Sequence, residues 1–253
     1  MPDEQDYIQP DWDDPTRWNR FYSEKQQESW IIGRDPRYLI HTIRNLELRP
    51  PLRILDAGCG ISTLPELAAF LGHRVVAIDI SETAIDICRE RTVSIQDLER
   101  SLGHCYNWRI RGGKPMEYLE QGTGKVVDIH GELMKLHHPG CTVLKHEICD
   151  WNDPGLPDKY EPFDLILNQN GLRNASQDLM ENSFRSFYRL LKPEGALIET
   201  NVNAIVRIET MNRAAESAGF VLLEEAYVAY RRNRYEGELK PENKYAVCCW
   251  PTG

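Results

Sequence analysis

The feature that most constrains this chain is a pair of apolar segments joined through a glycine-containing turn. The first segment, RILDA, runs into Gly58-Cys59-Gly60, and leucines and alanines at helical spacing follow. The second segment, RVVAID, then ends at Asp79. Short apolar runs are typical of buried strands, and a strand, a helix and a second strand in succession indicate parallel pairing. The sequence therefore predicts a parallel βαβ unit with its glycine turn at the end of the first strand.

The rest of the chain continues the same alternation of strands and helices. Together with the first unit it predicts an α/β fold with a mostly parallel seven-stranded sheet and helices on both faces. The last two strand candidates are joined by a polar loop, which suits an antiparallel hairpin at the sheet edge. The further strand candidates are residues 142–149, 163–167, 196–199, 221–227 and 245–250.

The length and composition fit one domain over residues 1–253, since 41% of the residues are hydrophobic and can bury one substantial core. Residues 1–15 are rich in Asp, Pro and Gln, and we expect a mobile tail there. Residues 16–50 carry aromatic and aliphatic side chains at helical offsets, which predicts two helices before a core of residues 51–253. A charged, glycine-containing insertion at about residues 100–139 precedes the third strand and is expected to lie over one face or edge of the sheet.

The net charge and the cysteine content limit which partners and which cellular compartment we expect for this protein. A formal net charge of -9 argues against an extended phosphate-binding surface, so nucleic acid is an unfavoured partner. The sequence contains neither an apolar run of the roughly 18 residues that a membrane span needs nor a signal-peptide pattern. Seven scattered cysteines fit a reducing compartment. We expect a cytoplasmic protein that does not enter membranes. The sequence does not decide whether the protein is a monomer or a homodimer.

With Asp56 directly before the glycine turn, the segment DAGCG followed by AID resembles the class I, Rossmann-like S-adenosylmethionine-dependent methyltransferases. Their first motif is an acidic residue followed by Gly-x-Gly, and their second strand ends in an acid. The resemblance covers roughly residues 53–199 and implies S-adenosyl-L-methionine as the cofactor. It implies that Asp56 and the backbone of Gly58 and Gly60 hold the methionine part, and that Asp79 holds the ribose.

The same resemblance assigns four more positions. Ile80 would pack against the adenine, and Asp150, with Trp151 following it, would bind the adenine amino group. Asn168 matches the position beside the methionine amine and the reacting methyl group. An NAD-binding domain is the main alternative, but Ser62 replaces the third glycine that such domains use. An acid before the turn would also repel a pyrophosphate and suit a cationic sulfonium.

The acceptor is less constrained than the cofactor. Residues 168–173 offer amides and one cation but no carboxylate, with Asn170 and Arg173 as candidate substrate contacts. This composition favours an acceptor that arrives already nucleophilic, and it leaves any catalytic residue or general base unidentified. A small-molecule acceptor is preferred. A protein methyltransferase and a catalytically silent cofactor-binding protein remain alternatives, and RNA methylation comes last.

Three further aromatic residues are candidate substrate contacts: Trp18, Tyr22 and Trp30. The N-terminal helices that carry them look like the lid of thiopurine methyltransferase-like enzymes, although aromatics at this spacing also serve ordinary packing. We expect the insertion and the loop between the final strands to join these helices around the acceptor; an insertion that only covers the sheet or builds a dimer contact is the alternative.

No bound metal is expected. The nearest candidate ligands match no usual zinc spacing, and the regions after the fourth and fifth strands carry asparagines rather than a cluster of carboxylates. The candidate ligands are His137, His138, Cys141, His146 and Cys149.

Overall fold

A computed structural model describes the protein at residues 14–25, 39, 51–103, 107–109, 117–119, 126–139, 143–169, 177–202, 208–225, 228–232 and 239–251. None of the helices in these ranges is long and apolar enough to cross a membrane. The predictions for the tail, Trp30, Asn170 and Arg173 fall outside them, apart from the last two residues of the tail.

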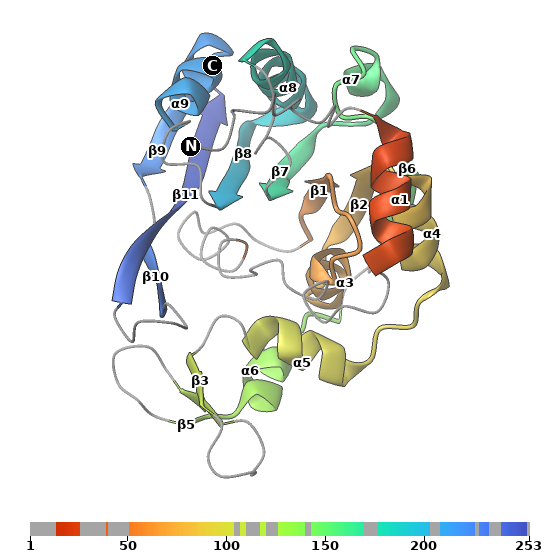
Figure 1. Ribbon diagram of the computed structural model, residues 1–253, viewed down its shortest axis with the longest axis vertical. Coiled ribbons are helices and arrows are strands. Elements are labelled where there is room, and N and C mark those ends of the chain that lie inside the picture. Colours follow the sequence, from red (N-terminus) through yellow and green to blue (C-terminus); the bar gives the residue numbers. More distant parts are fainter. Residues whose placement is uncertain are drawn as a thin grey trace, which may run out of the picture.

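One mostly parallel sheet forms the centre of the molecule (Figure 1). Its strands lie in the order β10-β11-β8-β7-β1-β2-β6, and β9 pairs with β11 as well. The pairs β8–β7, β7–β1, β1–β2 and β2–β6 are parallel, as the alternation of strands and helices predicts. The parallel strands are Arg53–Ala57 (β1), Arg74–Asp79 (β2), Val143–Ile148 (β6), Phe163–Gln169 (β7) and Leu191–Val202 (β8).

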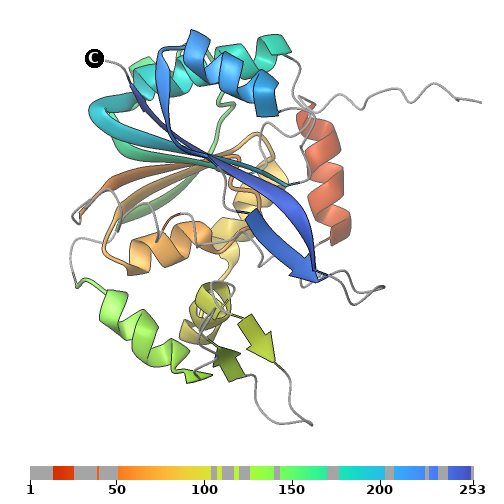
Figure 2. The same ribbon diagram turned by 90° about the vertical axis from the view of Figure 1, so that its left-hand side faces the viewer.

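Helices cover both faces of this sheet (Figure 2). Ile54 and Leu165 belong to the core beside α3, whereas their chain neighbours Leu55 and Ile166 belong to the core beside α8 and α9. Successive residues of a strand point to opposite faces, so strands that are apolar throughout can be buried on both sides. The covering helices are Leu64–Phe70 (α3) and Glu82–Glu90 (α4) on one face, and Leu156–Lys159 (α7), Gln177–Leu190 (α8) and Ile208–Ser217 (α9) on the other.

The antiparallel edge departs from the sequence prediction in one respect. Phe220–Glu225 (β9) and Leu239–Pro251 (β11) pair antiparallel, as expected of the final hairpin. An additional strand, Val228–Arg232 (β10), pairs with residues 239–243 of β11, so the described part of the sheet has eight strands rather than the predicted seven. The last two residues of β10 and residues 239–243 of β11 fall in the polar segment RRNRYEGELKPENK, which shows no hydrophobic alternation and is interpreted from the sequence as a loop.

The insertion packs on the outer side of α3 (Figure 2). It includes the end of Ile95–Gly103 (α5) and the whole of Ile129–Leu136 (α6), whose apolar faces meet Leu67 of α3. This cluster consists of Leu67, Leu71, Leu98, Leu102, Ile129 and Leu133. Three short strands form a separate antiparallel sheet beside these helices: Asn107–Arg109 (β3), Glu117–Leu119 (β4) and Val126–Val127 (β5).

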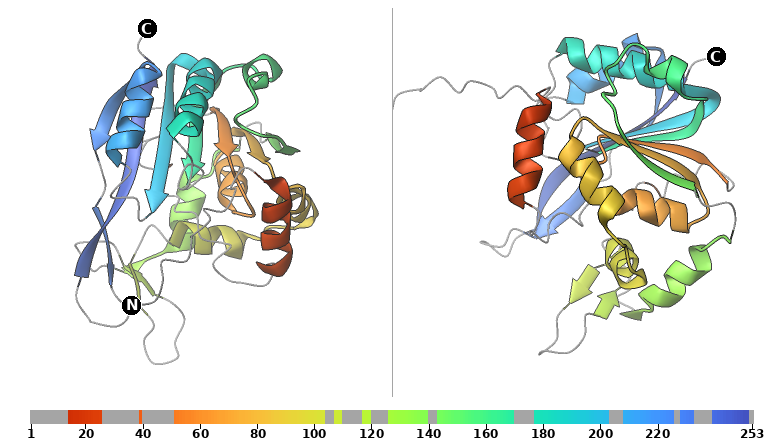
Figure 3. Two further views of the ribbon diagram at one scale, coloured as in Figure 1. Left: turned by 45° about the horizontal axis from the view of Figure 1, so that its top comes forward. Right: turned by 90° about the vertical axis from the view of Figure 1, so that its right-hand side faces the viewer.

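Of the two helices expected before the core, the first is described as Pro15–Lys25 (α1). Figure 3 shows α1 running along α4, and the two helices are in contact. Of the second, only Leu39 is described; it is helical and fully buried in the core beside α3. The N-terminal segment therefore contributes both to the core and to the surface next to α4.

Candidate functional site

The glycine turn after β1 is held close to the end of β2. The backbone N–H groups of Gly58 and Cys59 both donate to the carbonyl oxygen of Ile78, at 2.8 and 2.9 Å. Gly58 and Gly60 have φ angles of 69° and 53°, in the left-handed region that favours glycine. The turn therefore needs glycine at both positions, and it directs the chain into α3 beside the carboxyl ends of two parallel strands.

Two acidic residues flank this turn. Asp56, at the end of β1, is fully buried, and Asp79, at the end of β2, is 5% exposed. One carboxylate oxygen of Asp79 accepts from the backbone N–H of Gly60 at 2.8 Å, and the other accepts from the N–H of Ser81 at 2.9 Å. Asp79 therefore ties the end of β2 to the glycine turn and to the residue that precedes α4.

Aromatic rings lie against both glycines. A Cβ at Gly58 would be 2.9 Å from Cζ3 of Trp151, and a Cβ at Gly60 would be 2.5 Å from Oη of Tyr22. The indole Nε1 of Trp151 is buried and has no hydrogen-bond partner among the described residues. The sequence predicts that Trp151 lies next to the adenine-binding acid and that Tyr22 belongs to a lid. The structure places both side chains directly at the glycine turn.

The loop after β6 positions Asp150. Its Oδ1 accepts from the backbone N–H of Asn152 at 2.8 Å and from the side-chain amide of Asn152 at 3.1 Å. The hydroxyl of Ser183, on α8, in turn donates to Oδ1 of Asn152 at 2.5 Å. These bonds tie the loop that carries Asp150 and Trp151 to α8. Ile80, between Asp79 and Ser81, is partly exposed at the same edge of the sheet.

A buried carboxylate that the sequence analysis overlooked lies beside Asn168. Asn168 on β7 and Glu199 on β8 are register partners in adjacent parallel strands, and both are fully buried. The sequence argument considered only residues 168–173 after β7 and found no carboxylate there. Glu199 was detectable as the acid that follows the apolar run ALI, but the register that brings it to Asn168 was not.

Helix α1 is docked on the start of α4 by another residue that the sequence analysis missed. Oδ1 of Asn19 accepts from the hydroxyl of Ser81 at 2.7 Å and from the backbone N–H of Thr83 at 3.1 Å. Three half-buried aromatic rings lie on the same helix, with Trp18 stacked on Tyr22 at 6.0 Å between ring centroids and Phe21 edge-on to both. An asparagine in a polar helix carries no local signal of such a contact.

Of the candidate metal ligands, all but Cys141 lie in the described ranges. Within the described ranges, no group of three or more His, Cys, Asp and Glu side chains lies close enough to hold a metal ion. Nδ1 of His137 is 2.7 Å from the carbonyl oxygen of Phe70, which is a structural contact. Cys59 is buried in the turn, where its thiol donates to the carbonyl of Gly60 at 3.5 Å.

Solved structures share this fold. A TehB-like SAM-dependent methyltransferase from Corynebacterium glutamicum superimposes with a TM-score of 0.56 at 17% identity, over 94% of this chain and 100% of that chain. The magnesium protoporphyrin IX methyltransferase from Synechocystis with bound SAH superimposes with a TM-score of 0.56 at 12% identity, over 94% of this chain and 99% of that chain. The Rossmann-like α/β fold implied by the resemblance is thereby confirmed. The sequence matches neither a protein-family model nor a curated protein.

Proposed function

We propose that this protein is an S-adenosylmethionine-dependent methyltransferase. The observation that carries the proposal is the glycine turn itself, with left-handed Gly58 and Gly60 facing the carboxylate of Asp79 and bordered by the rings of Trp151 and Tyr22. In open α/β sheets, ligands bind beyond the carboxyl ends of the strands, which is where this turn lies. Two proteins that share the fold are methyltransferases: one is named as SAM-dependent, and the other was solved with bound SAH.

The residues at the turn fit the chemistry of this cofactor. Asp79 offers carboxylate oxygens as acceptors for the two ribose hydroxyl groups, and Trp151 offers a flat ring and an indole N–H that has no partner among the described residues. Asp56 and Asp79 place carboxyl groups on both sides of the glycines. In their ionised form these groups attract a cationic sulfonium and repel the pyrophosphate of a dinucleotide. Asp150 and Asn168 are the proposed partners of the adenine amino group and the methionine amine.

The chemistry that the cofactor supplies when bound is a methyl group activated by its positive sulfur. The chain's task is then to hold an acceptor in line with that methyl group and to exclude water. The rings of Trp18, Phe21 and Tyr22 can provide an apolar cover on the side of α1, which Asn19 fixes to α4. Glu199 is a buried carboxyl group in the strand next to Asn168, a kind of side chain that residues 168–173 lack.

A small molecule is the acceptor class that we favour. The net charge of -9 disfavours nucleic acid, and an aromatic cover on α1 suits a closed pocket. One structural neighbour, the magnesium protoporphyrin IX methyltransferase, is named for a small-molecule substrate. A protein acceptor is the second candidate, because the same negative charge would attract a basic segment. The acceptor site that we propose includes the insertion and the loop after β10.

A methyl-transfer assay tests this function. The protein is incubated with methyl-labelled S-adenosylmethionine and panels of small thiols, phenols and amines, basic peptides and total RNA, and transferred label is counted. The proposal expects label in one of the small-molecule panels and its loss in the Asp79→Asn variant. Label found only in peptides or RNA would support the proposed methyl transfer but would reject a small molecule as the acceptor. Binding of the cofactor without transfer to any panel or to cell extract would favour the catalytically silent alternative.

A further inference from the structure

Three successive backbone carbonyls at the glycine turn are bound by two side chains from the end of α4. The thiol of Cys88 donates to the carbonyl of Gly60 at 3.3 Å. The guanidinium of Arg91 donates through Nη1 to the carbonyl of Ile61 at 2.5 Å and through Nη2 to the carbonyl of Ser62. Burial raises the pKa of Cys88 to about 12, so the thiol keeps its proton and can donate. The turn is therefore held by its carbonyls as well as by its N–H groups.

A buried counter-charge fixes Arg91 in this position. Its Nε donates to Oε1 of Glu66, on α3, at 2.8 Å, and Nη2 binds the same oxygen. The two side chains are only 18% and 12% exposed. Nε2 of His146, on β6, lies 3.8 Å from Oε1 of Glu66. Burial, with Arg91 and Arg89 nearby, lowers the pKa of His146 to about 4, so at neutral pH the imidazole adds no charge to the pair.

The geometry of Arg91 requires a guanidinium. Its five N–H donors lie in one rigid plane, which allows it to bind two neighbouring carbonyls and a carboxylate at once. A lysine ammonium is a single donor point on a flexible stem, so it could keep the ion pair with Glu66 but could not span both carbonyls. Arginine thus joins α3, the end of α4 and the turn in one network.

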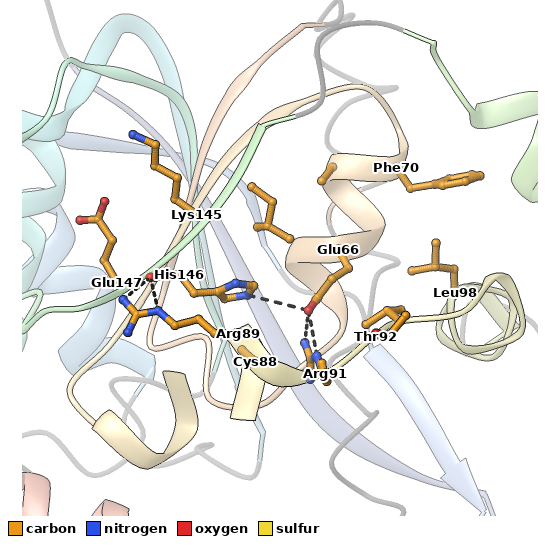
Figure 4. A pocket seen from close by; sticks show the side chains of 13 residues that line it. Glu66, Phe70, Cys88, Arg89, Arg91, Thr92, Leu98, Lys145, His146 and Glu147 are labelled. Carbon is orange, nitrogen blue, oxygen red and sulfur yellow. Dashed lines mark hydrogen bonds and ion pairs between the residues drawn. The ribbon is translucent and has the colours of Figure 1, made fainter. Parts of the chain in front are cut away.

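A groove gives access to this network from the surface (Figure 4). It has a volume of about 860 Å³ and lies between α3, the segment after α4 and β6. In Figure 4, Arg91 and His146 both point toward Glu66. Arg89 lines the same groove, but it donates to the carbonyl of His146 at 2.8 Å and not to the turn. Arg89 is therefore a matched control for Arg91.

We propose that Arg91 is a positioning residue, which holds the glycine turn in its cofactor-binding shape through the carbonyls of Ile61 and Ser62. This inference rests on the proposed function for its binding readout. It assigns Arg91 no contact with the reacting groups. The ion pair with Glu66 holds the guanidinium in place, and the two hydrogen bonds of the guanidinium to the carbonyls of Ile61 and Ser62 fix the backbone of the turn.

Calorimetry with S-adenosylhomocysteine tests the inference on the full chain. Arg91→Lys and Arg91→Ala should each weaken the affinity about tenfold or more, because buried carbonyls of the turn lose their donors. Arg89→Ala should leave the affinity within twofold of wild type. Equal affinities for the wild-type chain and the Arg91→Ala variant would overturn the inference.

A second readout needs no cofactor. Hydrogen exchange of the backbone at residues 58–64 should be at least tenfold faster in Arg91→Ala than in Arg89→Ala, and this acceleration should exceed the one that a general loss of stability produces in β7 and α8. If the wild-type chain binds no S-adenosylhomocysteine, the proposed function fails, and this exchange measurement alone decides whether Arg91 holds the turn. Exchange at residues 58–64 that equals that of the control would reject the role.

Removing Arg91 also leaves Glu66 buried without its partner, which by itself destabilises the protein. The double variant Arg91→Ala with Glu66→Gln removes both charges and should regain part of the lost free energy of unfolding. Its affinity for S-adenosylhomocysteine should nevertheless stay weak. Recovery of the affinity together with the stability would reduce Arg91 to a structural ion-pair partner and overturn the inference.

The groove allows a chemical rescue as the most specific test. Methylguanidinium at about 20 mM should restore at least part of the affinity of the Arg91→Ala variant, because it can enter the groove and supply the forked donors. Methylammonium at the same concentration should not restore it. Rescue by neither cation, or by both equally, would contradict a role that depends on the guanidinium fork.

Discussion

The carboxylate of Asp79 accepts a hydrogen bond from the backbone N–H of Gly60 at 2.8 Å, which ties the end of β2 to the turn that follows β1. The second oxygen of the same carboxylate accepts a hydrogen bond from the backbone N–H of Ser81, the N-cap residue of α4. One side chain therefore orders both segments that a cofactor would contact. We propose that the same carboxylate binds the ribose hydroxyl groups of the cofactor.

Replacing this carboxylate should weaken cofactor binding. In Asp79→Asn the amide nitrogen cannot accept from a backbone N–H, so one of the two bonds to Gly60 and Ser81 is lost. We expect the free energy of binding S-adenosylhomocysteine to become less favourable by about 1–3 kcal/mol in calorimetry. Asp86→Asn, on the exposed face of α4, is the matched control and should bind as the wild type does. Equal affinities for the two variants would remove Asp79 from the site.

The contact between Gly60 and Tyr22 should be visible as energetic coupling. Gly60→Ala puts a Cβ at a φ of 53° and 2.5 Å from Oη of Tyr22, and the backbone strain alone costs about 1–2 kcal/mol. Tyr22→Phe removes the clashing hydroxyl, so the double variant should be more stable in urea unfolding than the sum of the single effects predicts. Gly72→Ala, whose Cβ would meet His138 instead, should be additive with Tyr22→Phe. Additivity in both pairs would mean that Tyr22 does not lie over the turn.

The docking of α1 depends on Asn19. Removing its side-chain oxygen in Asn19→Ala breaks the bonds to Ser81 and Thr83, so hydrogen exchange of residues 15–25 should become faster while β1 and β2 stay protected. Asn19→Asp keeps an acceptor at this position and should restore the slow exchange. Unchanged exchange in Asn19→Ala would show that other contacts hold α1, and a lid on this helix would lose its anchor.

The buried His73 should make stability depend on pH. Its Nδ1 accepts from the backbone N–H of Leu52 at 3.3 Å, and burial lowers its pKa from 6.5 to about 4. The folded state favours the neutral ring, so this contribution is fully present above pH 6.5 and is lost as the pH falls toward 4. A shift of this size corresponds to about 3 kcal/mol.

Urea unfolding between pH 4.5 and 7.5 measures this effect. His146 titrates in the same window, so the comparison is between the wild type and His73→Asn, which keeps an acceptor but does not titrate. The wild type should lose stability more steeply than the variant as the pH falls. Parallel curves would show that His73 is not held in its neutral form by the fold.

The parts of the site that the sequence could predict are those with a local cause. The left-handed glycines, the apolar strands around them and the acid at the end of β2 all lie within one βαβ unit. Asn19, Arg91 and Glu199 were missed because their roles depend on partners far along the chain or in another strand. Arg91, for example, reaches carbonyls 29 and 30 residues away. No periodicity encodes such a contact, since it follows from how α3 and α4 pack.

The fold was predictable to a similar extent and for similar reasons. Parallel strands that are buried on both faces carry continuous apolar runs, which identified β1, β2 and β7. The edge strand β10 was not identified because its last two residues, Arg231 and Arg232, and its partner residues 239–243 lie in a polar stretch without hydrophobic alternation. The side on which the insertion packs is decided by apolar side chains of α3, α5 and α6, and the sequence alone does not show which of their faces meet.

Calorimetry of the wild-type protein with S-adenosylmethionine, S-adenosylhomocysteine and NAD tests the central claim most directly. We predict one binding site per chain for the methyl donor and for its demethylated product, and no detectable heat with NAD. Binding of NAD without binding of either sulfur compound would contradict the account, because the glycine turn and Asp79 would then serve a dinucleotide.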